Sequence, residues 1–139
     1  MVYRLTVHKI EQSCLFELTW GQGQRLPASL PYPGQLTQIY QAWQRAYMGY
    51  YQQALRGRPG ASGQLASTHV DWQGQLVQAE ARLLLEFHQW LRREELFDIR
   101  AELVRGETTS PSTLFLSCSP LEIARLPWET WEIGADLGQ

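Results

Sequence analysis

The sequence lacks the features that define several large classes of protein. Its only two cysteines, Cys14 and Cys118, have no paired spacing, which disfavours a disulfide framework or a zinc site and favours a reducing cytoplasm. No run approaches the roughly 18 apolar residues of a membrane span. Residues 1–10 also lack the apolar core of a signal peptide. We therefore expect a cytoplasmic protein that makes no membrane contact of its own.

Basic residues are also too sparse to form a dense stripe. Residues 1–70 carry six Lys or Arg against two acids, so +4, and residues 71–139 carry six Arg against twelve acids, so −6; together they give the net −2. Nucleic-acid binders need clustered cations to neutralise phosphates. The scattered charges here predict no nucleic-acid partner.

What the chain does have is a large apolar and aromatic content. It contains 139 residues, 44% of them hydrophobic, with six Trp, six Tyr and four Phe. This composition predicts one globular domain over residues 1–139 with a core built from aromatic side chains.

The first part of the chain alternates with the period of β-strands. Residues 2–10 and 14–20 each place apolar side chains at every second position, and three polar residues separate them, which predicts a hairpin. A weaker strand is expected at 25–30. Pro27 within it would remove a ladder donor, so this strand belongs at a sheet edge.

Beyond Pro31–Gly34 the period changes to that of helices. We expect one long helix at 35–56, whose aromatic stripe runs through Trp43 and Tyr47, and a second at 72–93 with Asp71 as its N-cap. The Gly- and Ser-rich residues 57–70 predict a flexible loop between them. A shorter helical segment follows at 95–104, then a loop at 106–112, and residues 114–116 predict a short buried strand.

This order predicts an α/β fold, with α+β as the alternative. A long helical crossover most naturally returns a strand parallel to one already present. We expect a small mixed sheet of three or four strands, with the last strand beside the first and both long helices packed on the sheet. Cover is expected on both faces of the sheet. The predicted core joins the two helices through one cluster: Trp43, Tyr47, Leu83, Phe87 and Trp90.

The end of the chain carries a short distinctive motif. After the strand and a Ser119-Pro120 helix start comes the corner Leu126, Pro127, Trp128 and Glu129. It resembles the LPWE segment in the amino-terminal half of CHAT domains, the caspase-like domains of many bacterial multidomain proteins. We expect Pro127 to fix the chain direction, Trp128 to anchor inward and Glu129 to pair with an Arg.

Three further segments extend this resemblance. Residues 16–24, 43–47 and 86–91 are similar to the amino-terminal region of cyanobacterial multidomain signalling proteins of the CHAT and CHASE types. The resemblance implies the amino-terminal module of a larger protein and the amino-terminal half of a caspase-like fold, with residues 134–139 beginning a linker. The family's catalytic His and Cys follow the corner and have no matching positions here.

No constellation in the chain predicts catalysis. Cys118 stands between a strand and a helix start, where a thiolate could be stabilised, but no His precedes it in a recognisable motif, and a structural thiol is the favoured interpretation. His8, His69 and His88 show no metal-ligand spacing. The Gly21–Gln24 turn lacks the Lys and the helix of a phosphate cradle. We therefore expect no enzyme activity, cofactor or metal in this chain.

Surface contact is the remaining route to function. The aromatic stripe of the first helix could form a partner groove, although core packing is favoured for it. Met48 and Leu55 flank that stripe, and Leu85 lies on the polar side of the second helix. These three residues are the predicted contact surface for another domain, a protein partner or a second copy in a homodimer.

Two functions from different classes follow. The first is a non-catalytic interaction or regulatory module of a cyanobacterial signalling protein. The second is the amino-terminal half of a CHAT-type cysteine protease whose catalytic His and Cys lie downstream. The next ~150 residues of the parent gene, about the length of one domain, would separate them. A strand ending in His and a later strand ending in Cys would favour the protease, and transmembrane spans would favour a sensor.

Overall fold

A computed structural model describes residues 1–56 and 70–133 of the chain. The loop predicted at 57–70, apart from Val70, and the linker predicted at 134–139 lie outside the described residues. The strands are β1 (Val2–Ile10), β2 (Ser13–Trp20), β3 (Gln24–Pro31) and β4 (Thr113–Ser119). The helices are α1 (Gly34–Arg56), α2 (Trp72–Leu91), α3 (Phe97–Thr109) and the short α4 (Leu121–Ala124), with 3-10 turns η1 (Glu94–Leu96) and η2 (Trp128–Thr130).

The four strands form one mixed sheet in the order β3-β2-β1-β4. The first three strands are antiparallel neighbours, and β4 lies parallel to β1, with Leu5 opposite Leu116. The predicted α/β class, the hairpin and the parallel returning strand are thereby confirmed. Pro27 lies in the edge strand β3, as its missing N–H requires.

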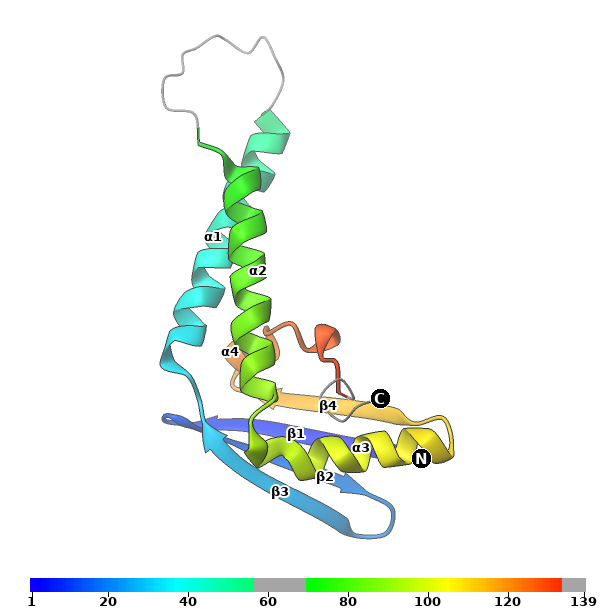
Figure 1. The fold of residues 1–139 in the computed structure, drawn as a ribbon. Helices are drawn as coiled ribbons and strands as arrows, with labels where there is room; N and C mark the ends of the chain where they lie inside the picture. Colours follow the sequence, from blue (N-terminus) through cyan, green and yellow to red (C-terminus); the bar gives the residue numbers. More distant parts are fainter. Residues whose placement is uncertain (57–69, 134–139) are drawn as a thin grey trace.

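The alternation in β1 and β2 builds the core from one face of the sheet. Tyr3, Leu5 and Val7 of β1 point to the same side as Phe16 and its buried neighbours in β2, and all are at most 1% exposed. Helix α3 lies along the sheet in Figure 1 and contributes Ile99 and Leu103 to the same core. It extends to Thr109, so the loop predicted at 106–112 is wrong for its first half.

The expectation that both long helices pack on the sheet is wrong. Figure 1 shows α1 and α2 side by side as a hairpin that rises away from the sheet, and only its base joins the core. The residues that do so are the following: Leu36, Ile39, Leu83, Phe87, Trp90 and Leu91. Beyond this base the two helices pack mainly on each other (Figure 1). The core face of the sheet is covered instead by α3 and the carboxyl-terminal segment (Figure 1). We call the α1–α2 hairpin the arm; its base joins the core, and residues 40–56 and 72–82 project beyond the sheet.

The expected cover on both faces of the sheet is also wrong. The face opposite the core carries exposed side chains, among them Val2 at 51% and Phe115 at 53%, with the Arg4 guanidinium over the Phe115 ring. The strand predicted as buried is therefore an edge strand with one open face. Polar residues between the apolar ones keep this face compatible with water, as is common in sheets with antiparallel strands.

The base of the arm is joined firmly to the sheet. Trp90 is 2% exposed, donates its indole N–H to the carbonyl of Pro31 at 2.9 Å and meets Tyr32 edge to face. Phe87 is fully buried and packs edge to face on Trp128, with ring centroids 5.1 Å apart. The predicted burial of Leu83, Phe87 and Trp90 is confirmed.

Candidate surface on the helical arm

The aromatic residues of α1 form a continuous row on the arm. Tyr40, Trp43, Tyr47 and Tyr51 follow one another at helical spacing, and successive ring centroids lie 5.6, 5.5 and 6.4 Å apart. Exposure grows along the row, because Trp43 is half-buried whereas Tyr47 is 44% and Tyr51 50% exposed. The predicted burial with Phe87 is therefore wrong for Tyr47, whereas Trp43 is half-buried and packs against the core cluster that contains Phe87.

The reason is that α1 uses a different face to pack on α2. That face consists of small or aliphatic residues, namely Ile39, Ala42, Ala46 and Gly49. Ala46 is 4% exposed, and Gly49 lies so close to the ring of Trp72 that a Cβ there would overlap it. Small side chains allow the helices to approach closely, so the aromatic rings remain on the side of the arm.

Near the start of α1, the side of the helix that carries Thr37 is covered by the carboxyl-terminal segment. Thr37 of α1 donates its hydroxyl proton to the carboxylate of Glu122, which follows β4, at 3.4 Å. Met48 and Leu55 lie 11 and 18 residues beyond Thr37, which brings them back to the same side of the helix at 100° per residue. Within the described residues nothing covers these positions, and the same side continues exposed toward the tip.

Met48 and Leu55 thus lie beside the aromatic row. They are 49% and 66% exposed, and together with Trp43, Tyr47 and Tyr51 they form what we call the arm stripe. Helix α1 contains no acidic residue, and its only charged residues are Arg45 and Arg56. The stripe is therefore apolar and aromatic, on a helix of positive charge.

Leu85 does not belong to this stripe. It is 53% exposed, but it lies two residues from the buried Leu83, and two residues turn a helix by about 200°. Leu85 therefore lies on the side of α2 that faces away from the buried side, near the base of the arm. The structure brings Met48 and Leu55 together and leaves Leu85 apart from them.

The carboxyl-terminal corner anchors the chain against the arm. Trp128 is 9% exposed and donates its indole N–H to the carbonyl of Ile123 at 2.8 Å, and Leu126 is 3% exposed. Pro127 immediately precedes the turn η2. The inward position predicted for Trp128 is confirmed. Glu129 is exposed and forms no ion pair within residues 1–56 and 70–133, so its predicted pairing with an Arg is not found there.

The two cysteine thiols lie in environments that favour the protonated form. Burial raises the pKa of the Cys118 thiol to about 11. Burial also raises that of Cys14 to about 12, against a smaller opposing effect of Lys9. Such thiols stay protonated at neutral pH and are poor nucleophiles, which agrees with the structural interpretation of Cys118.

One polar pair was not anticipated from the sequence. The Nδ1 of His8 and the hydroxyl of Ser119 lie 2.6 Å apart on the open face of the sheet, at the carboxyl ends of β1 and β4. The two residues are 111 positions apart in the sequence, so only the parallel register of the two strands would have predicted the pair. Both residues are exposed, and neither lines a described cavity. His88, by contrast, bonds to Thr130 and helps to hold the corner on the arm.

No protein family, curated protein or solved structure matches this chain. The resemblance to CHAT domains therefore remains a prediction. In the described part of the chain, no group of three or more His, Cys, Asp or Glu residues could hold a metal ion. None of the described helices is long and apolar enough to cross a membrane.

Proposed function

We propose that this chain is a protein–protein interaction module that binds its partner through the arm stripe. The observation that carries the proposal is the row of neighbouring aromatic rings on a projecting helix, with Tyr47 44% and Tyr51 50% exposed beside Met48 and Leu55. Contiguous apolar patches on soluble domains usually mark binding sites, and Tyr, Trp and Met are enriched at them.

The geometry of the arm supports this role. A two-helix arm holds the stripe away from the sheet, so that a partner helix or groove can reach it without meeting the body (Figure 1). Aromatic side chains that already contact their neighbours have few rotamers to lose on binding, which lowers the entropy lost on association. The joint through Phe87, Trp90 and Trp128 holds the arm in one direction relative to the body.

On the resemblance to cyanobacterial CHAT and CHASE proteins, we propose that the module belongs to a bacterial signalling protein. The partner is then another domain of the parent protein or a separate protein, and a second copy is the alternative. Leu85, on another side of the arm, is a second contact point in this proposal.

Site-specific crosslinking tests the stripe directly. A photoreactive phenylalanine analogue replaces Tyr51 in the full-length protein in its native cells, and the matched control carries it at Gln52, which is exposed on another side of α1. We expect a discrete crosslinked species from position 51 and none from position 52. Equal yields at both positions, or none at either, would contradict the proposal.

Charge substitution gives an independent test. Met48→Glu and Leu55→Glu should leave the fold intact, because both side chains are exposed, and should weaken the complex identified by crosslinking. Sedimentation velocity of the purified wild type and variants shows whether that complex is a homodimer. A complex that survives both substitutions would rule out the stripe as its contact surface.

A second candidate function is the amino-terminal half of a CHAT-type cysteine protease. The observation that favours it is that β4 is a parallel strand at the edge of the sheet, from which a larger parallel sheet could continue. The full reading frame of the parent gene tests it. A downstream strand ending in His and a later one ending in Cys would support the protease, and transmembrane spans would support a sensor.

A further inference from the structure

The two edges of the sheet differ in how they resist further strand pairing. The edge strand β3 contains Pro27 and ends at Pro31, and its Arg25 forms an ion pair with Glu17 of β2. Prolines and charges are the usual devices that prevent an edge from pairing with another chain. The edge strand β4 has none of them, since Thr113–Ser119 is seven residues long with no proline and no charge.

The outer edge of β4 presents free backbone groups. Thr113 donates its N–H to the carbonyl of Met1, so it points toward β1. Because backbone groups alternate along a strand, those of Leu114, Leu116 and Cys118 point outward. No strand of the described chain pairs with this edge. It offers three N–H and three C=O groups in a row.

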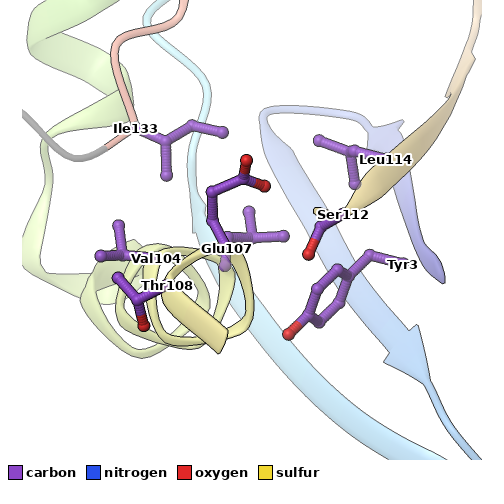
Figure 2. Close-up of a pocket in the computed structure, with 8 residues that line it drawn as sticks. Tyr3, Val104, Glu107, Thr108, Ser112, Leu114 and Ile133 are labelled. Atoms are coloured by element: carbon purple, nitrogen blue, oxygen red, sulfur yellow. The ribbon is translucent and has the colours of Figure 1, made fainter. Parts of the chain in front are cut away.

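An apolar cavity lies beside this edge on the core side. Its volume is about 350 Å³, and its apolar lining comes from Tyr3, Leu103, Val104, Leu114 and Ile133. Figure 2 shows these side chains around a gap between α3 and β4, with Glu107 reaching toward the space between Ile133 and Leu114. Leu116, next along β4 on the same face, is 38% exposed. Among residues 1–56 and 70–133, the core is therefore incompletely covered under β4.

The charge at the cavity specifies the occupant further. Glu107 is exposed and makes no ion pair within the residues that the structure describes. A second copy pairing β4 with β4 would bring no cation to it, because that strand carries no charge. A different chain with a basic residue near its apolar side chain would complement both the cavity and the carboxylate.

We propose that β4 is a docking edge for an extended segment of a partner protein. The segment adds to the sheet as a fifth strand, places an aliphatic side chain in the cavity between α3 and β4, and sets a Lys or Arg beside Glu107. Backbone pairing supplies affinity in this mode of recognition, and the pocket supplies specificity. The site is separate from the arm stripe and does not depend on it.

Capped octapeptides test this edge on the intact chain. The probe alternates Val and Thr and carries one Lys at its amino end, and a matched peptide has every backbone amide N-methylated. We expect the unmethylated peptide to shift the ¹H–¹⁵N signals of Leu114, Leu116 and Cys118 and to slow their hydrogen exchange. The methylated peptide should do neither, because it cannot donate to the edge. Equal binding by both peptides, or no shift at these three amides, would overturn the proposal.

Two protein variants examine the parts of the site separately. Leu116→Lys should abolish peptide binding, whereas Leu15→Lys, on the open face of β2 and 44% exposed, should leave it unchanged. The Lys peptide should bind about two- to fivefold more tightly than its Glu counterpart, and Glu107→Lys should reverse that order. Glu107 is a surface residue, so this second test stands even if Leu116→Lys fails to fold. A wild-type dimer that Leu116→Lys dissociates, with no peptide binding, would assign the edge to a second copy and overturn the proposal.

Discussion

Replacing Gly106 with alanine should destabilise the protein, although the same change in an open helix stabilises it. Gly106 is buried in α3 against the fully buried Tyr3 of β1. A Cβ at position 106 would lie 2.7 Å from two ring carbons of Tyr3 and nearer still to its hydroxyl oxygen. The ring would have to move, and it would strain the bond of its hydroxyl to the Glu102 carboxylate, now 2.9 Å.

The expected magnitude follows from two opposing effects. Helix propensity favours Ala over Gly by about 1 kcal/mol. Overpacking a buried site typically costs about 1–3 kcal/mol, and a weakened hydrogen bond adds about 1 kcal/mol. We therefore expect Gly106→Ala to lower the free energy of unfolding by about 1–3 kcal/mol.

Urea unfolding followed by tryptophan fluorescence measures this change. The control is Gly34→Ala at the start of α1, where no atom lies within 4 Å of the added Cβ, and stability should stay equal or rise by up to about 1 kcal/mol. In a Tyr3→Phe background, which lacks the hydroxyl, Gly106→Ala should cost less, by about 1 kcal/mol of coupling. A stabilising Gly106→Ala, or the absence of coupling to Tyr3, would refute the reasoning.

Four further predictions concern the core, the carboxyl-terminal corner, the thiols and pH. Phe87→Ala should lower the free energy of unfolding by about 3–5 kcal/mol, because the ring is fully buried. Tyr51→Ala on the same arm should lower it by less than about 1 kcal/mol. Similar urea midpoints for the two variants would show that the arm is not divided into a buried base and an exposed stripe. Trp128→Ala should likewise lower the melting temperature seen by circular dichroism, and an unchanged value would mean that the corner does not anchor the chain. Iodoacetamide at neutral pH should label Cys14 and Cys118 slowly in the folded protein and rapidly in urea, because burial raises both pKa values; rapid labelling of folded Cys118 would reopen the enzyme hypothesis. Burial, and secondly the hydrogen bond to Glu102, raises the pKa of Tyr3 from 10.0 to about 12. The stability that the protonated hydroxyl contributes is therefore complete below pH 10 and is lost as the pH rises toward 12. Tyr3→Phe should lose less free energy of unfolding between pH 10 and pH 12 than the wild type, and identical pH dependences would argue against a buried hydroxyl.

The fold was predictable wherever one local signal decided it. Alternation in residues 2–10 and 14–20 determined which side chains enter the core, and Pro27 identified an edge. Asp71 was correctly predicted as an N-cap, and its carboxylate accepts the N–H of Gly74 at 3.1 Å. The crossover rule placed β4 beside β1 because both ends of that connection were recognisable.

What could not be predicted depends on partners that are distant in the chain. Helical periodicity gave the face on which Trp43 and Tyr47 lie, but it could not show that α2 packs on the neighbouring face of small residues. Similarly, the apolar residues of β4 indicate a strand without showing whether another strand lies beyond it. The pair of His8 and Ser119 depends on strand register and leaves no local pattern.

The filled joint at the base of the arm has a mechanical consequence. Leu55 lies sixteen residues beyond Ile39 on α1, about 24 Å along the helix, whereas Trp90 and Phe87 occupy the pivot. A lateral force on the outer turns of α1 therefore acts as a torque on the end of β3, where the Trp90 indole donates a hydrogen bond to Pro31. A partner that binds the outer turns of α1 would therefore act on the end of β3 through a lever about 24 Å long.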